Sequence, residues 1–113
     1  MANTFKLKTK AGIDASLVDV YTVPSSTTTV VIGLTIANIK GASVTADAKI
    51  ISDTSDSETN ADVYLAKDIP LPTGSSVEVM AGNKIVLQTT DVIKAKSDAS
   101  GSIDSILSIM EIT

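Results

Sequence analysis

The chain has 113 residues, a formal net charge of −4, and no cysteine, histidine or tryptophan. Its nine basic residues are all lysine. These absences exclude a Ser-His-Asp triad, a Cys-His pair and the usual zinc sites, so we expect a protein without enzymatic activity. Nucleic acid is an unsuitable partner, because phosphate binding needs a basic surface.

The length predicts one domain over residues 1–113. Hydrophobic residues make up 43% of the chain but aromatic residues only 3%, so the core must be aliphatic. No segment approaches the roughly 18 apolar residues of a membrane helix, and residues 1–10 lack the apolar centre of a signal peptide. We therefore expect no membrane partner.

Serine and threonine contribute 28 residues, which together with abundant valine and isoleucine is typical of β structure. The first predicted strand covers residues 4–10 and alternates strictly. One face carries Phe5, Leu7 and Thr9, and the other carries Lys6, Lys8 and Lys10. A period of two predicts a strand with one solvated face, and the lysines predict a place at the edge of a sheet.

A second strand is predicted over 17–23, where Pro24 ends it. The run 28–39 is the longest apolar stretch and predicts a central strand. From Ile32 onward it alternates, with Ile32, Leu34 and Ile36 on one face and Gly33, Thr35 and Ala37 on the other. We expect Gly33 and Leu34 in the interior of the sandwich, with Gly33 as a bulge or a point of close approach. Residues 44–51 are predicted to be its antiparallel partner, with inward side chains at Val44, Ala46, Ala48 and Ile50.

Residues 52–60 contain no apolar side chain and predict a solvated loop. Oxygen-bearing side chains recur there at short spacing, at Asp53, Asp56, Glu58, Asn60 and Asp62. Calcium takes six to eight such oxygens, but this loop lacks the glycine of an EF-hand turn. We favour a solvated hairpin tip and predict no metal site and no cofactor, with a cation in this loop as the alternative.

A strand is predicted over 62–68, followed by the segment Ile69, Pro70, Leu71 and Pro72. Proline lacks a ladder donor, so the two prolines predict an extended, unpaired passage with exposed apolar side chains. The segment is either a crossover between sheets or a contact site for a neighbouring subunit. We predict an interface that includes these four residues and the lysines Lys6, Lys8 and Lys10, which suit an acidic protein surface.

Short strands over 75–80 and 84–88 are expected to pair around a turn at 81–83, and 92–97 forms the next strand. Residues 103–112 fit both a helical stripe and a strand, but their isoleucines and serines favour a strand. Apolar residues on both its faces predict a central position. The pattern as a whole predicts an all-β fold: a single-domain antiparallel β-sandwich, or flattened barrel, of about eight to nine strands.

Core and turn positions from about Leu17 to the C-terminus resemble those of small virion structural proteins of tailed bacteriophages. The segments that carry this resemblance are 21–24, 28–39, 64–74, 82–97 and 105–112. The resemblance implies a non-enzymatic protein in the virion that sits on a capsid, neck or tail, and the absence of cysteine fits assembly in the reducing host cytoplasm. It also implies that the protein binds other virion proteins and copies of itself as a homo-oligomer, and it carries over no site residues.

A second function class stays open, namely a non-catalytic β-sandwich module that binds a carbohydrate or a host surface. The scarcity of aromatic residues counts against it, because sugar-binding surfaces rely on aromatic rings and the chain has only Phe5, Tyr21 and Tyr64.

Overall fold

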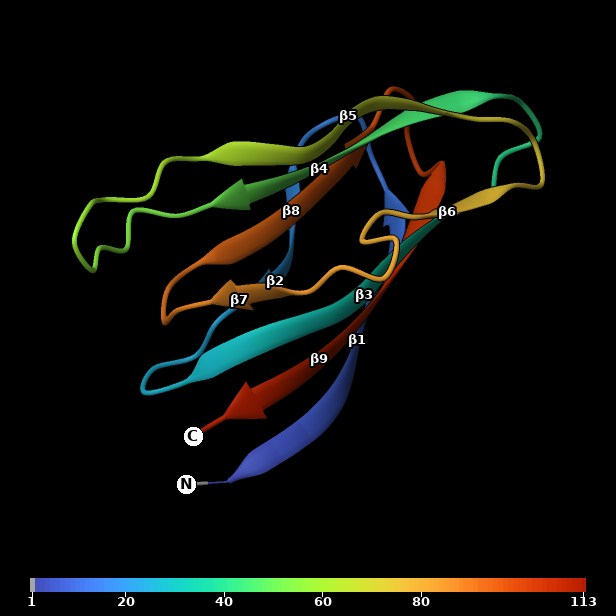
Figure 1. Ribbon diagram of the computed structural model, residues 1–113. Helices are drawn as coiled ribbons and strands as arrows, with labels where there is room; N and C mark the ends of the chain where they lie inside the picture. The colour runs from blue at the N-terminus through green and yellow to red at the C-terminus, as the bar shows by residue number, and fades with distance from the viewer. Residues whose placement is uncertain (1) are drawn as a thin grey trace.

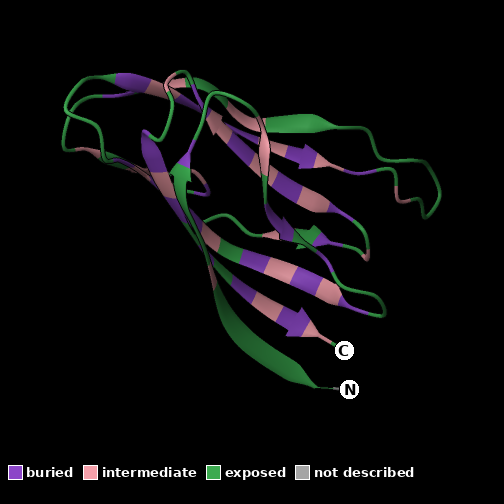
Figure 2. Cartoon of the chain, turned by 180° about the vertical axis from the view of Figure 1, so that it is seen from behind, coloured by how far each residue is buried: buried purple, intermediate pink, exposed green. Residues whose placement is uncertain are grey.

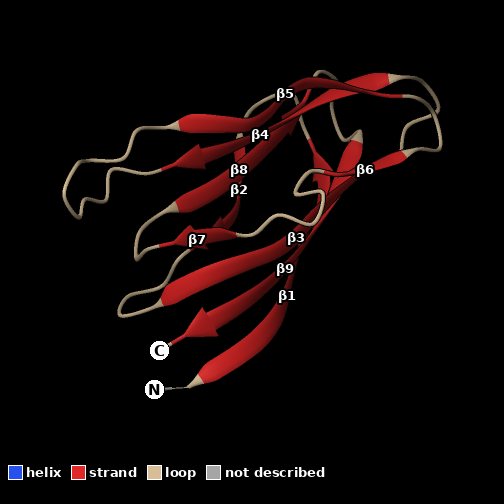
Figure 3. Cartoon of the chain, in the orientation of Figure 1, coloured by secondary structure: helices blue, strands red, loops and turns tan. Residues whose placement is uncertain are grey.

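The computed structural model describes residues 2–113, which form two antiparallel sheets packed face to face (Figure 1). The strands are β1 (Asn3–Ile13), β2 (Val18–Thr22), β3 (Thr28–Asn38), β4 (Val44–Ile51), β5 (Val63–Leu71), β6 (Ser76–Glu78), β7 (Ile85–Leu87), β8 (Val92–Ser97) and β9 (Ile103–Ile112). None of the described residues is helical (Figure 3). The predicted all-β sandwich is confirmed, and it is not a closed barrel.

The first sheet has the order β1-β9-β3, with β6 and β7 both on the far side of β3. The second sheet has the order β2-β8-β4-β5. β9 lies between β1 and β3, so the central position predicted from its two apolar faces is confirmed. The edge position predicted for the lysine-bearing β1 is confirmed as well.

The core between the sheets is aliphatic, as the composition requires. Fully buried side chains come from both sheets and include Val31, Leu34, Ile36, Ile93 and Leu107. Alternation along each strand produces this layer, because every second side chain points to the same face of a sheet. Figure 2 shows the resulting alternation of buried and less buried positions along β3, β8 and β9, whereas β1 is almost uniformly exposed.

The predicted pairing of 28–39 with 44–51 is wrong. β4 lies in the other sheet and pairs with β5 and β8, although its predicted inward residues are all buried. The connection after β3 crosses between the sheets instead of closing a hairpin. Asn38 supports this crossing, because its side-chain amide donates to the carbonyl oxygens of Ala42 and Leu71, both at 2.9 Å.

The predicted hairpin of 75–80 with 84–88 is also wrong. β6 pairs with residues 35–37 of β3, and β7 pairs with residues 29–31. The two short strands therefore cover successive lengths of one edge of β3 instead of pairing with each other. The intervening turn is closed locally, where the Asn83 amide donates to the Met80 carbonyl at 2.9 Å.

The register of β3 shifts between Val31 and Gly33, which places a bulge at Ile32. Of the two alternatives for Gly33, the bulge is the one observed, but its unpaired residue is Ile32, which points outward and is 37% exposed. Leu34 lies in the interior as predicted, whereas the interior position predicted for Gly33 is wrong, because Gly33 is half-buried on the outer face. The Glu78 carboxylate fills the space beside Gly33 and accepts from the Leu34 amide at 2.9 Å. Partial burial opposes ionisation of Glu78, but hydrogen bonds from Leu34, Thr35 and Met80 hold its pKa below the usual range.

Candidate functional site

β1 is the least covered strand of the molecule. One of its edges pairs with β9, and within residues 2–113 no strand pairs with the other edge. Its side chains from Asn3 to Lys10 are exposed on both faces, apart from a half-buried Lys8. Phe5 is 73% exposed and Leu7 64% exposed. Large apolar side chains on an open strand edge are a typical site of protein association.

The two faces of β1 are arranged differently from the expectation of one solvated face. Lys6 lies opposite Ile109 and Lys8 opposite Leu107, and residues paired in this way share a face of the sheet. Ile109 and Leu107 are buried, so the lysines point toward the inner side and Phe5 points outward. Both faces stay exposed because the opposite sheet leaves this half of β1 uncovered.

A buried carboxylate explains why one lysine belongs on the inner side. Glu111 in β9 is 4% exposed, and its Oε1 lies 2.7 Å from Lys6 Nζ. Tyr21 donates its hydroxyl proton to Glu111 Oε2 at 2.6 Å, so Thr29 must donate to the Tyr21 oxygen at 2.8 Å. This network connects four strands, β1, β2, β3 and β9.

The environment of the network shifts the pKa values of Glu111 and Tyr21 in opposite directions. The hydrogen bond from Lys6, then that from Tyr21, holds the pKa of Glu111 below its usual range. Burial, together with the Glu111 carboxylate, raises the pKa of Tyr21 to about 12. Glu111 is therefore an anion at neutral pH, and it anchors β1 electrostatically to the sandwich.

The outer face of the first sheet carries an apolar row that runs across four strands. Register aligns Phe5 of β1 with Met110 of β9, Met110 with Val30 of β3, and Val30 with Val86 of β7. We call these four residues the outer apolar row. Phe5 and Val86, at the two ends of the row, are 73% and 57% exposed, and Met110 and Val30 between them are half-buried. An apolar row with exposed ends is a candidate for contact with another chain.

The segment 69–72 differs from its prediction. Leu71 is 2% exposed and pairs with Val44, and Ile69 pairs with Ala46, so the segment is neither unpaired nor generally exposed. Proline is accommodated because β5 is an edge strand, where the missing donor faces away from the ladder. Pro70 and Pro72 are exposed, and their part in an interface stays a prediction.

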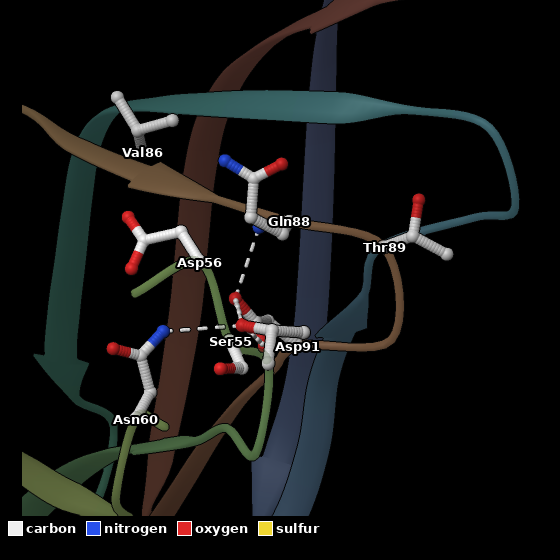
Figure 4. Close-up of a pocket in the computed structure, with 8 residues that line it drawn as sticks. Ser55, Asp56, Asn60, Val86, Gln88, Thr89 and Asp91 are labelled. Carbon is white, nitrogen blue, oxygen red and sulfur yellow. Dashed lines mark hydrogen bonds between the residues drawn. The ribbon is translucent and has the colours of Figure 1, made fainter. Parts of the chain in front are cut away.

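The loop over 52–60 is solvated, as expected, and it borders a hollow of about 670 Å³ beside β7 (Figure 4). The hollow is lined by Thr54, Ser55, Asp56, Asn60, Val86, Gln88, Thr89 and Asp91. Sequence reasoning missed it, because its two walls meet only in the folded chain. Buried Asp91 holds the walls together by accepting from the Gln88 amide at 2.9 Å and the Thr54 hydroxyl at 3.2 Å.

Residues 2–113 contain neither a cluster of metal ligands nor a helix that could span a membrane. In this part of the chain, no three acidic side chains come together in a group that could hold a metal ion. Over the same residues, no helix has the length and apolar character needed to cross a membrane.

The fold occurs in solved structures of assembled particles and appendages. A chain of the T13 viral particle of infectious bursal disease virus (IBDV) matches 96% of this chain at 10% identity and a TM-score of 0.57. A chain from the Gx strain of the same virus also matches 96%, at 13% identity and a TM-score of 0.55. A chain of Bacillus endospore appendages, which form disulfide-linked pili, matches 99% at 13% identity and a TM-score of 0.51.

These identities establish a shared fold only. Our chain spans 30% of the T13 particle chain and 87% of the appendage chain. No protein-family model matches the sequence, and no curated protein matches it. The fold is thus one that viral particle proteins use and that a pilus protein also uses.

Proposed function

We propose that this protein is a structural subunit of a virus particle that binds copies of itself and other particle proteins, without catalysing a reaction. The observation that carries the proposal is β1, a free edge strand that exposes Phe5 and Leu7. Phe5 and Leu7 leave apolar area exposed along this unpaired edge, which favours association, while Lys6, Lys8 and Lys10 restrict pairing to a partner that accommodates their charge. An assembly would cover it.

Two similarities support the virion as the location. The fold is similar to that of the IBDV particle chains, and core and turn positions resemble those of small tailed-phage virion proteins. The finer assignment that we propose is a capsid, neck or tail protein of a tailed phage, assembled in the host cytoplasm. The absence of cysteine suits assembly in a reducing compartment.

The likeness to the Bacillus appendage chain favours a second candidate, a subunit of an extracellular filament. That chain is matched over 87% of its own length, more than the virus chains are. Its appendages are disulfide-linked pili, whereas our chain has no cysteine and would have to polymerise without covalent links. Electron microscopy bears on the choice, because closed rings or shells are expected only of a particle protein, whereas open fibres alone would leave the filament candidate in place.

The polar hollow beside β7 favours a third candidate, a module that binds a carbohydrate or a host surface. Its walls present the amides of Asn60 and Gln88 and the carboxylate of Asp56, which suit a ligand rich in hydroxyl groups. A glycan array with the purified protein tests this function. Specific glycan binding by a monomer would replace our proposal with this one.

Light scattering after size-exclusion chromatography tests self-assembly directly. We expect a defined oligomer from the full chain and a shift toward monomer in the variant F5S/L7S, which removes the apolar side chains of β1. The matched control is Val63→Ser, which changes an apolar side chain of similar exposure, 53%, on β5. A wild-type chain that stays monomeric at every concentration would overturn the proposal.

A further inference from the structure

We propose that β1 of one copy adds as a strand to the free edge of β7 in a second copy, with its lysines directed at the acidic hollow and its apolar side chains beside Val86. This inference rests on the proposed self-assembly and names the contact that produces it. Strand addition of this kind supplies main-chain hydrogen bonds for affinity and alternate side chains for specificity.

Both edges are open, and their directions are compatible. β7 pairs with β3 on one side, and among residues 2–113 no strand pairs with its other side. β1 is antiparallel to β9, β9 to β3, and β3 to β7. A second copy placed next in the same sheet therefore presents β1 antiparallel to β7, and the ladder continues without a change of pattern.

The side-chain faces match as well. The outer apolar row begins at Phe5 on β1 and ends at Val86 on β7, the two opposite edges of the sheet. When β1 of a second copy joins β7, its Phe5 and Leu7 continue the row on the outer face next to Val86. Three side chains that are each more than half exposed would then cover one another.

Charge complementarity selects a basic occupant for the edge of β7 that borders the hollow. The described residues place no carboxylate within ion-pair distance of Lys8 or Lys10, and no lysine within that distance of Asp53, Asp56 or Glu58. Both charged residues that line the hollow are acidic, Asp56 and Asp91 (Figure 4). The Ser57 and Glu58 amides hold the pKa of Asp56 below its usual range, so its carboxylate stays ionised to meet a lysine.

A symmetric pairing of two β1 strands is unfavourable by the same reasoning. In an antiparallel β1–β1 pair, inner-face residues oppose inner-face residues, so lysine would face lysine. Like charges placed directly opposite destabilise a strand pair. The contact is therefore head-to-tail between different surfaces, and repetition of it generates a ring or a filament.

Disulfide trapping tests the contact, because the chain has no cysteine of its own. The variants F5C/V86C and L7C/V86C cover two neighbouring registers on the same face. Within one chain these positions lie three strand spacings apart, about 14 Å. That exceeds the roughly 7 Å limit of a disulfide. Under oxidation we expect a ladder of linked copies from at least one double variant, and none from the control L7C/V63C, which targets the β5 edge.

A charge exchange provides the second measurement. The variant K8E/K10E should raise the concentration for half-assembly roughly tenfold, because like charges would then meet at the hollow. Adding Asp53→Lys and Asp56→Lys to it should restore assembly, whereas the two lysine substitutions in an otherwise unchanged chain should impair it. Rescue by the combination is not expected from a purely structural role of β1.

The outcomes separate this inference from the function on which it rests. A wild-type chain that is always monomeric overturns both. A wild-type oligomer that gives no double-variant ladder overturns only the β1–β7 contact. Dimers from the single variant Leu7→Cys, with no longer species from the double variants, would show a symmetric β1–β1 pair and also overturn it.

Discussion

Glu111 is the residue on which the attachment of β1 to the sandwich depends. It is a buried carboxylate that accepts from Lys6 of β1 and Tyr21 of β2, two strands that belong to different sheets. A buried charge is tolerated only when it is paired and hydrogen-bonded. Removing the hydrogen bond from Lys6 or from Tyr21 should therefore lower the stability of the folded protein.

We expect Tyr21→Phe to lower the free energy of unfolding by about 1–3 kcal/mol, because it leaves buried polar groups on Glu111 and Thr29 without their partner. Urea denaturation monitored by circular dichroism measures the change. Tyr64→Phe is the matched control. Tyr64 is 42% exposed, so the loss of its hydroxyl should leave the free energy of unfolding unchanged. Equal stability of both variants would contradict the network.

Acid should destabilise the protein through the same residue. The pKa of Glu111 in the folded chain lies below the ordinary value of 4.5, so ionised Glu111 adds stability above about pH 4.5. That contribution is lost as the pH falls through the folded pKa, and Glu78 acts in the same direction. We expect Glu111→Gln to flatten this acid limb in denaturation curves between about pH 7 and pH 2.5. An unchanged limb would assign the loss to other carboxylates.

Among the elements, β5 shows how a proline fits into a sheet, since Pro70 lies within the strand and Pro72 directly after its end. Leu71 and Ile69 continue the ladder with β4, while Pro70 between them is exposed at the sheet edge. The chain thus keeps two apolar side chains in or near the core on either side of a residue that cannot donate.

We expect Leu71→Ala to cost about 2–5 kcal/mol, the usual range for a buried leucine, and Leu34→Ala in β3 to cost a similar amount. Pro70→Ala should change the free energy of unfolding by less than about 0.5 kcal/mol, as is typical of exposed positions. Thermal or urea denaturation compares the three variants. A Leu71→Ala variant that keeps full stability but assembles poorly would instead support an interface role.

At the scale of the whole molecule, the described part of the chain has an acidic loop at one border of β7 and a basic strand at the opposite edge of the same sheet. Carboxylates in the loop and next to it accept hydrogen bonds from the backbone amides of the loop. Asp56 accepts from the Glu58 amide, and Asp62 accepts from the Ser52 amide at 2.9 Å. An acidic loop and a basic strand at opposite edges of one sheet suit association between copies more than they suit the binding of a single cation in the loop.

We expect the melting temperature to be the same, within about 1 °C, in excess EDTA and in excess calcium. A ligand that binds only the folded state raises stability by mass action, so a calcium site would show as a shift of several degrees. Magnesium at equal ionic strength controls for simple screening of the carboxylates. A calcium-specific shift would assign a cation to the loop over 52–60.

The sequence by itself determined the class of fold and most strand positions. Alternation is a local property, so β1, β3, β4 and β9 can be found from neighbouring residues alone. The same local signals predicted the edge position of β1 and the bulge near Gly33. The absence of histidine, cysteine and arginine also limits which reactions and ligands the side chains can support, because it is a property of composition and does not depend on the fold.

Only the tertiary structure decided which strands pair and which face of each strand is covered. β4 joins β8 and not β3, and β6 and β7 share one edge of β3, because pairing depends on crossovers between sheets that no short segment encodes. The bulge leaves Ile32 on the outer face, because the extra residue breaks the alternation that would otherwise place it on the same face as Leu34 and Ile36. The inward lysines of β1, the buried Leu71 and the hollow beside β7 all depend on how far the opposite sheet extends, which is a property of the whole fold.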